Sequence, residues 1–190
     1  RPLIVAIAAG ITLTALERWF GLEAALVRCM PNTPALVGSG ASGLFANARV
    51  SAAQRDIADQ LLGAVGLSVW VDSEADIDSV TALSGSGPAY FFLMMEAMQE
   101  SAIKLGLTPA MAKSLTYQTA LGAAQLAIAS EEDTAQLRRN VTSPNGTTEW
   151  AINHFEDGGL RQLVDGALTA AHDRSVELAG EVHSLLQPHK

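Results

Sequence analysis

The sequence predicts a partial Rossmann-like α/β sheet followed by an all-α dimerisation domain. Three observations support this fold class. Short apolar runs alternate with helical stretches up to residue 72, an order that is typical of α/β sheets. Only helical patterns follow from residue 73 to residue 190, and one of these helices is apolar almost all round. We therefore expect two domains, residues 1–72 and residues 73–190.

The first domain contains four apolar runs of strand length. The run "LIVAIAA", residues 3–9, is continuous, which is the pattern of a parallel strand covered on both faces. The other strands are expected at residues 25–30, 43–47 and 67–71. Two helices are expected between them, at residues 12–20 and 51–66, and Ser51 with Gln54 forms a capping box at the start of the second. Proteins rarely begin inside a buried strand, so we expect the sequence to be a fragment.

The second domain is expected to be helical throughout. The first two helices are residues 88–105, with Gly106 past the end, and a helix that Thr108 caps and Pro109 opens. Three more helices are expected at residues 131–141, 147–155 and 160–186. The helix from Pro88 carries "AYFFLMMEAMQESAI", which leaves only a narrow polar stripe. Such a helix must be buried on all sides, so we expect a second copy of the chain to surround it.

Composition and charge exclude several classes of protein. The formal net charge is −8, and it arises in residues 73–190, where seven Lys/Arg face fifteen Asp/Glu, whereas residues 1–72 hold five of each. This field repels phosphate backbones, which argues against nucleic-acid binding. Cys29 is the only cysteine, so a structural thiol in a reducing, cytoplasmic setting is expected. The four histidines show no metal-ligand spacing and no apolar run spans a bilayer, so neither a metal nor a membrane is implied.

Two segments rich in glycine and hydroxyl groups precede helices: "LSGSGPAY" before the helix from Pro88, and "TSPNGTTE" before the helix from Thr147. The first turn of a helix presents unpaired N–H groups, which bind anions. Ser143, Thr147 and Thr148 add hydroxyl donors, and without a Lys or Arg in the loop a carboxylate suits it better than a phosphate. The alternative is that both segments are plain caps and turns, the more common role of such residues.

Four motifs in this order and spacing carry a resemblance to a known family: "AIAAG", "CMPNTPA", "LSGSGPAY" and "LRRNVTSPNGTT". The chain resembles pyrroline-5-carboxylate reductase, an oxidoreductase of proline biosynthesis that reduces the C=N bond of 1-pyrroline-5-carboxylate to L-proline with NADPH or NADH. The similarity runs from Leu3 to about Leu186. The family's opening strand, G-x-G-x-x-G turn and helix are missing, so this chain alone is expected to be inactive. The residues that choose between NADPH and NADH belong to that missing half.

The resemblance implies roles for particular residues. Residues 1–72 become the C-terminal part of a dinucleotide-binding domain, and residues 73–190 a helical dimerisation and substrate-binding domain. The implied substrate-binding residues are Glu131, Ser143, Gly146, Thr147 and Thr148. The implied cofactor-binding residues are Ile7, Ala8, Ala9, Pro88 and Asn140. Thr148 is the candidate catalytic residue, as a proton relay to the ring nitrogen or as a hydroxyl that only orients the substrate.

The resemblance also implies a homodimer with exchanged helices, or a higher oligomer built from such dimers. In that case the "TSPNGTT" loop of one subunit reaches the "AIAAG" strand end of its partner, and the active site is shared. Two other hypotheses for the function stay open. One is another NAD(P)-dependent dehydrogenase with a helical second domain, although these loops carry no Lys or His to handle an alcohol proton. The other is a non-catalytic helical module that dimerises or binds a carboxylate.

Overall fold

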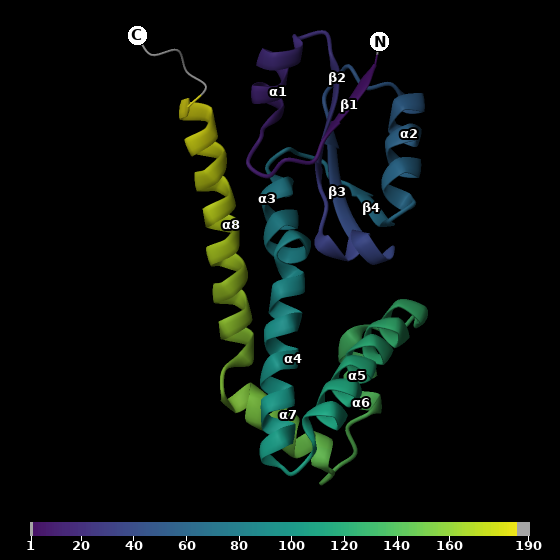
Figure 1. Ribbon diagram of the computed structural model, residues 1–190, viewed down its shortest axis with the longest axis vertical. Coiled ribbons are helices and arrows are strands. Elements are labelled where there is room, and N and C mark those ends of the chain that lie inside the picture. The colour runs from purple at the N-terminus through teal and green to yellow at the C-terminus, as the bar shows by residue number, and fades with distance from the viewer. Residues whose placement is uncertain (1, 186–190) are drawn as a thin grey trace. The chain divides into compact units, whose positions relative to one another are not determined.

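The computed structural model describes residues 2–185 and consists of a four-stranded sheet followed mostly by helices (Figure 1). The predicted end of the last helix at residue 186 lies outside the described residues. The elements, in which η1 is a 3₁₀-helix and η2 a π-helix, are β1 (Leu3–Ala6), α1 (Leu13–Phe20), β2 (Ala25–Met30), η1 (Thr33–Val37), β3 (Gly40–Ala46), α2 (Ala52–Gly63), β4 (Gly66–Trp70), α3 (Asp76–Val80), η2 (Thr81–Gly85), α4 (Gly87–Lys104), α5 (Pro109–Ala129), α6 (Thr134–Asn140), α7 (Thr147–Asp157) and α8 (Leu160–Leu185).

The chain forms two compact units. The first comprises residues 1–88 together with residues 166–190, and the second comprises residues 89–165. In the first unit, the last part of α8 returns to the sheet region, where the Ser175 hydroxyl donates a buried 2.6 Å hydrogen bond to Asp78 of α3. The predicted domain boundary after residue 72 rests on the sequence pattern and stays a prediction.

The sheet of the first unit has the strand order β1-β2-β3-β4. Strands β1 and β2 are parallel, β2 and β3 are antiparallel, and β3 and β4 are parallel. Figure 1 shows α2 on one side of this sheet and α1 and α3 on the other. The mixed sheet followed by helices agrees with the predicted fold class.

Alternation along the strands explains the two layers of core. Val27 and Cys29 of β2 point to the side of α2 and pack there with Leu44, Ala58 and Leu62. Leu26, which precedes Val27, points to the opposite side, where it packs with Leu13 and Leu16 of α1. Because successive side chains of a strand point to opposite faces, each helix layer covers its own set of apolar residues.

The first strand differs from the prediction. It spans Leu3–Ala6 rather than residues 3–9, and its residues are half-buried rather than covered on both faces. The physical reason is that, among the described residues, β1 has a strand neighbour on one side only, β2. Ile7, which follows the strand, is 63% exposed.

The third and fourth strands and the helix between them are confirmed with shifted ends. Strand β3 ends at Ala46 because the side chain of Asn47 accepts a hydrogen bond from the amide of Leu26 and donates to the carbonyl of Ala24. Helix α2 has the predicted Ser51–Gln54 capping box but stops at Gly63 rather than residue 66. Gly66 begins β4 with φ of 151°, and a Cβ there would meet the carbonyl oxygen of Gly40. Only glycine allows this approach of β3 and β4.

The segment before α4 was wrongly expected to be a loop. The chain continues from the short helix α3 into "LSGSGPAY" without a loop, because residues 81–85 form a π-helix that Ser86 caps, and α4 begins at Gly87. Hydroxyl side chains stabilise this turn, since Thr81 donates to the carbonyl of Ile77 and Ser84 to that of Val80. One of the two glycines of this segment serves close packing, because a Cβ on Gly85 would lie 2.6 Å from Cε of Met30, whereas a Cβ on Gly87 would meet nothing within 4 Å.

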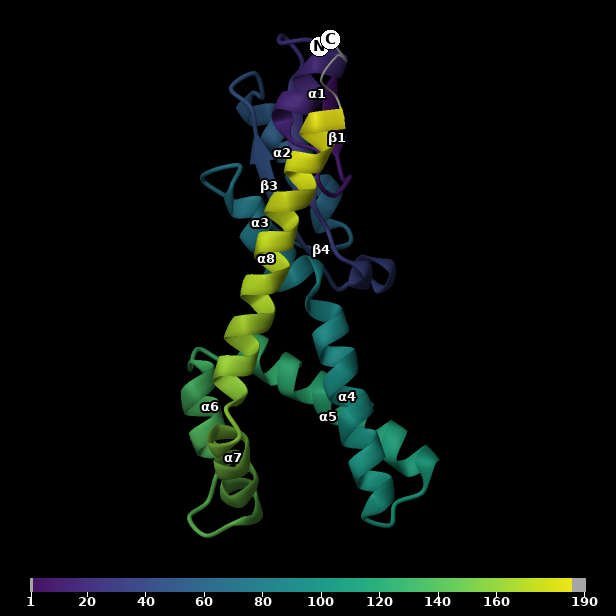
Figure 2. The same ribbon diagram turned by 90° about the vertical axis from the view of Figure 1, so that its left-hand side faces the viewer.

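The second unit, residues 89–165, contains most of α4, all of α5, α6 and α7 and the start of α8, and Figure 2 shows α6 and α7 lying next to each other. Thr108 caps α5 as predicted. Helix α6 begins at Thr134, so the expected start at residue 131 is wrong. The carboxylate of Asp133 accepts the amide of Gln136 at 2.7 Å and makes Asp133 the N-cap. Since the N-cap residue itself is not helical, residues 131–133 stay outside the helix.

Candidate functional site

The predicted cofactor residues Ile7, Ala8 and Ala9 follow the carboxyl end of β1 in the first unit. All three are exposed, and Ala9 and Gly10 form a turn that leads to α1. Ligands of open α/β sheets lie past the carboxyl ends of the strands, so the position suits a nucleotide. The two alanines add only methyl groups, which leaves the backbone of this segment accessible.

A partly buried ion pair fixes the start of α1, which follows this segment. Glu74 accepts the amide of Leu13, the first residue of α1, at 2.7 Å. The same Oε1 accepts Nη1 of Arg28 at 3.1 Å, and Arg28 lies in β2 with a side chain that is 5% exposed. Removing Glu74 would leave the charge of the buried Arg28 side chain uncompensated, which is costly. Glu74 and Arg28 therefore hold the start of α1, and the turn before it, against the sheet.

Pro88, the last predicted cofactor residue of the first unit, is the second residue of α4 and is half-buried. The segment before it is held by Asn32 of the "CMPNTPA" motif. The Asn32 side chain donates to the carbonyl of Ser84 at 3.0 Å and accepts the amide of Ala41 at 2.9 Å. The half-buried side-chain amide of Asn32 thus joins the π-helix to β3 and positions the start of α4.

The "TSPNGTTE" loop lies in the second unit, and its helix start differs from most others in the chain. Side chains of Thr12, Ser51, Thr108 and Asp133 cap α1, α2, α5 and α6. The N-cap of α7 is Gly146, which has no side chain and makes no such bond. The first-turn amides of α7 therefore receive no side-chain cap and stay available to an anion.

The loop has a defined conformation around this helix start. Asn145 is left-handed, with φ of 60°, and its amide donates to the carboxylate of Glu149 at 2.7 Å. The amide of Gly146 donates to the carbonyl of Ser143 at 3.0 Å. A Cβ at position 146 would lie 3.1 Å from that carbonyl oxygen, so glycine relieves the contact. These bonds place Ser143 beside the first turn of α7.

The structure brings four of the predicted substrate-binding residues together. Ser143, Gly146, Thr147 and Thr148 belong to one loop and the helix turn after it; Ser143 and Thr147 are exposed, and Thr148 is half-buried. Amide N–H groups, three hydroxyls and the positive end of an 11-residue helix share this place. The arrangement suits an anion that accepts several hydrogen bonds, such as a carboxylate.

Two predicted residues lie apart from this loop within the second unit. Glu131 is exposed in the bend between α5 and α6. Asn140, the last residue of α6, donates to Glu132 at 2.7 Å and accepts from Gln136 at 2.7 Å. A ligand contact by Asn140 would replace one of these exposed bonds. The carboxylate nearest to Asn140 is thus that of Glu132, which the sequence pattern did not single out.

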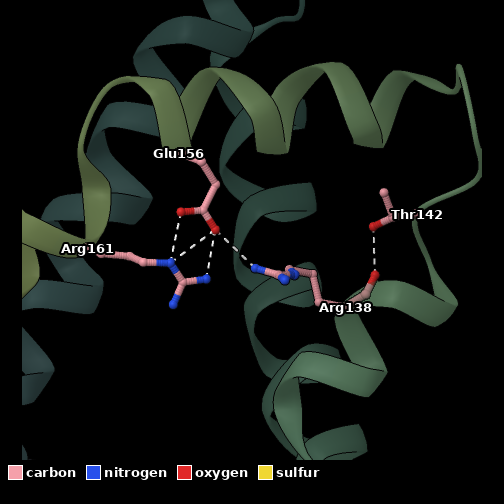
Figure 3. Close-up of polar contacts among 4 residues, drawn as sticks. All are labelled: Arg138, Thr142, Glu156 and Arg161. Atoms are coloured by element: carbon pink, nitrogen blue, oxygen red, sulfur yellow. Dashed lines mark hydrogen bonds and ion pairs between the residues drawn. The ribbon is translucent and has the colours of Figure 1, made fainter.

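An ion-pair cluster on α6, α7 and the start of α8 was also missed (Figure 3). Glu156 accepts from Arg138 at 3.1 Å and from two nitrogens of Arg161 at 2.7 and 2.8 Å. Hydrogen bonds from Arg161, supported by the charges of both arginines, lower the pKa of Glu156. The same bonds raise the pKa of Arg161. No spacing rule points to this cluster, because Arg138 and Glu156 are eighteen residues apart.

Other features lie away from the predicted site. A groove of about 570 Å³ between α4 and α5 is lined by Phe92, Met95, Glu96, Gln99, Glu100, Ile103 and Tyr117, none of them a predicted site residue. Cys29 is buried as predicted, and burial raises the pKa of its thiol to about 11. In the part of the chain that the structure describes, no three His, Cys, Asp or Glu side chains gather to hold a metal ion. Among residues 2–185, no helix combines the length and the apolar character needed to cross a bilayer.

The fold and the loop define an α/β protein with a helical second part and a candidate carboxylate site. The family model for pyrroline-5-carboxylate reductase dimerisation matches residues 74–178. The pyrroline-5-carboxylate reductase of Pseudomonas aeruginosa is 61% identical over 180 residues, which are 95% of this chain and 66% of that protein. The enzyme of Haemophilus influenzae is 45% identical over 93% of this chain and 65% of its own length. The chain therefore belongs to the pyrroline-5-carboxylate reductase family.

Solved structures confirm the predicted fold class. A pyrroline-5-carboxylate reductase from Coxiella burnetii matches with a TM-score of 0.91 and 52% identity, over 93% of this chain and 66% of that one. The Plasmodium falciparum pyrroline carboxylate reductase with NADP bound matches with a TM-score of 0.86 and 31% identity, over 93% of this chain and 70% of that one. The chain spans slightly less than two thirds of the length of the curated relatives named above.

Proposed function

We propose that this protein serves the NAD(P)H-dependent reduction of the C=N bond of 1-pyrroline-5-carboxylate to L-proline. Family membership supports the reaction, and NADP is bound in the related Plasmodium falciparum structure. The observation that carries the proposal is the uncapped start of α7, with the hydroxyls of Ser143, Thr147 and Thr148 around it. The substrate carboxylate accepts hydrogen bonds from these groups.

The chain's own residues act mainly by binding and orientation. The nicotinamide supplies a hydride to the imine carbon when NADPH or NADH is bound. Ile7, Ala8 and Ala9 fit a nucleotide because they are exposed past the end of β1 and small side chains predominate. Pro88 and Asn140 are the further proposed cofactor contacts, and Glu131 is a proposed contact near the substrate. An imine protonated on nitrogen is already electrophilic, so holding it in place supplies much of the rate enhancement.

Thr148 is the proposed catalytic residue. It occupies the second position of α7, so its amide and its hydroxyl both lie at the helix start. One role is to relay a proton to the ring nitrogen as it becomes an amine. The other is to orient the ring through a hydrogen bond without moving a proton. Both roles require the hydroxyl, so Thr148→Ser supports both of them and Thr148→Ala supports neither.

We propose further that the protein works as a homodimer with exchanged helices, alone or within a higher oligomer, in the cytoplasm. Apolar side chains on α4 support this: Phe91, Phe92 and Leu93 are 69%, 62% and 67% exposed in the single chain. So large an apolar surface requires cover. The proposed site is shared, with the strand end at Ile7–Ala9 of one subunit facing the "TSPNGTT" loop of its partner.

Calorimetric titration tests the proposal and separates it from its alternatives. The protein is titrated with L-proline and with NADPH, and imine reduction is followed as NADPH oxidation. We expect proline binding that depends on Thr148. Proline binding without reduction, even in a chain extended to the length of the relatives, would favour a carboxylate-binding module. Reduction of a ketone in place of the imine would favour a different dehydrogenase.

A further inference from the structure

We propose that Glu156 is a positioning residue that holds the carboxylate-binding loop in shape through its ion pairs with Arg138 and Arg161. This inference rests on the proposed function of that loop. Residues 141–146 join the end of α6 to the start of α7. Arg138 lies in the last turn of α6 and Glu156 in the last turn of α7, so their pairing links the two helices that carry the ends of the loop.

The geometry around Glu156 is a fork (Figure 3). Nε of Arg161 lies 2.8 Å from Oε2, and Nη2 of Arg161 lies 2.7 Å from Oε1. Nη1 of Arg138 reaches the same Oε1 at 3.1 Å. A bidentate arginine pair of this kind restricts the orientation of the carboxylate. Glu156 is therefore held by Arg161 in the orientation in which it meets Arg138.

Arg138 connects this cluster directly to the loop. Its backbone carbonyl accepts the hydroxyl of Thr142 at 2.6 Å, and the amide of Thr142 donates to the carbonyl of Arg139 at 3.0 Å. Thr142 immediately precedes Ser143, the first proposed contact to the carboxylate. A displacement of Arg138 would thus move Thr142 and Ser143 relative to the first turn of α7.

Little apolar packing is present to hold the loop in shape. Val141 is 61% exposed, and Ser143, Pro144 and Asn145 are exposed as well. With so little burial, the loop depends on polar contacts, and the ion pair between Arg138 and Glu156 spans from α6 to α7. Because Arg138, Glu156 and Arg161 are themselves exposed, salt should weaken these pairs. We therefore expect an effect on loop order and ligand affinity rather than on the stability of the whole chain.

The test compares Glu156→Gln, which removes the charge at nearly constant size, with Arg174→Gln as a matched control. Arg174 also makes two exposed ion pairs, with Glu177 and Glu181, but it lies on α8 away from the loop in sequence. Hydrogen exchange at residues 141–148 and calorimetry with L-proline are measured at low and high salt. For Glu156→Gln we expect about three- to fivefold faster exchange in the loop and a dissociation constant raised by a similar factor, with no change for Arg174→Gln.

Salt and the double variant sharpen the result. At high salt, the loop exchange rate and the proline affinity of the wild type should approach those of Glu156→Gln. The double variant Arg138→Gln/Glu156→Gln should differ little in either quantity from each single variant. Glu156→Asp, which keeps the charge, should restore part of the affinity. If Glu156→Gln does not fold, Arg138→Gln and Arg161→Gln provide the same comparison.

Failure of this inference is distinct from failure of the proposed function. Unchanged loop exchange and unchanged proline affinity in Glu156→Gln, with proline binding that still requires Thr148, would overturn the role of Glu156 and leave the function intact. Faster loop exchange in a protein whose wild type binds no proline would support the ion-pair restraint and overturn the proposed function.

Discussion

At the scale of single residues, Thr148 and Cys29 show how position decides chemistry. Thr148 is half-buried at the start of a helix that no side chain caps. Its hydroxyl therefore lies beside free amide donors, where it can join them in binding an anion. Cys29 lies in the middle strand pair, with only 2% of its surface exposed. Burial disfavours its thiolate, so the thiol acts as a small apolar side chain.

Thr148→Ala should weaken the binding of L-proline by roughly 1–2 kcal/mol, because a hydrogen bond to a charged carboxylate is lost. The measurement is calorimetric titration. Thr169→Ala is the matched control, since Thr169 is an exposed helical threonine of α8 outside the loop. Equal affinities for the wild type and Thr148→Ala would reduce "TSPNGTTE" to a helix start without a ligand.

Cys29 should resist alkylation by iodoacetamide in the folded protein at pH 8 and react once the chain is unfolded. The pKa of its thiol is about 11 in the folded state against 9.0 as the ordinary value. The folded state therefore holds this proton more tightly, and the stability it contributes is complete below pH 9 and lost as the pH rises toward 11. Mass spectrometry measures the alkylation. Urea denaturation at a series of pH values measures how the free energy of unfolding depends on pH. Rapid labelling under native conditions would contradict the burial of this side chain.

At the scale of elements, the missing side-chain cap of α7 lowers the stability of the helix but leaves its first amides free to bind a ligand. A Ser, Thr, Asn or Asp at the N-cap would occupy the amides that an anion needs. The chain uses such side chains at α1, α2, α5 and α6, but has Gly146 at α7. The most stable start for α7 is therefore not the one that suits the proposed ligand.

A side-chain cap at position 146 should therefore raise the stability of the protein and lower its affinity for the ligand. Gly146→Ser should be more stable than Gly146→Ala by about 1 kcal/mol, the usual worth of a side-chain cap. Yet Gly146→Ser should bind L-proline more weakly than Gly146→Ala, because its hydroxyl competes for the amides. Both variants carry the same Cβ beside the carbonyl of Ser143, so crowding cancels in the comparison. Thermal unfolding and calorimetry measure the two effects, and parallel changes in stability and affinity would refute the competition.

The second prediction at this scale concerns α4. Leu93→Glu should shift the protein from dimer to monomer, because a charge replaces an exposed apolar side chain in the surface proposed to be covered by a second copy. Ile57→Glu on α2 is the control, since Ile57 is also exposed and apolar but lies in the other unit. Sedimentation at micromolar concentration distinguishes the two states. A wild type that sediments as a stable monomer would refute the proposed dimer.

At the scale of the whole molecule, the question is how the two parts of the proposed site meet. The strand end at Ile7–Ala9 belongs to the first unit and the carboxylate loop to the second. If the dimer exchanges helices, each complete site draws one part from each subunit. A site of this kind explains why a helical domain that dimerises would also bind the substrate.

Subunit mixing tests this arrangement in a protein of the length of the relatives. Ala8→Trp should block the cofactor and Thr148→Trp the carboxylate, so each variant alone should be inactive. After random exchange, half of the dimers are mixed and each has one intact site, so about a quarter of the wild-type NADPH oxidation should return. No recovery, with subunit exchange demonstrated independently, would mean that both parts of the site come from one chain.

The sequence predicts local structure correctly where neighbouring residues decide it. Ser51 and Thr108 cap helices as the sequence predicts, because a cap bonds to an amide two or three residues away. The four motifs likewise led to the right family, which the relatives confirm. The expectation of a loop at "LSGSGPAY" was wrong because residues 81–85 form a π-helix and Gly85 packs closely against Met30 of β2.

The sequence by itself determined the four strands, the helices other than η1, α3 and η2, the family and the composition of the proposed carboxylate loop. The tertiary structure alone decided which distant residues hold these parts in place. Arg28 meets Glu74, Asp78 meets Ser175, and Arg138 meets Glu156 over separations of 46, 97 and 18 residues. Hydrogen bonds and ion pairs act over a few ångströms, so these partners interact only after the chain has folded and brought them together, and no periodicity along the chain encodes their pairing.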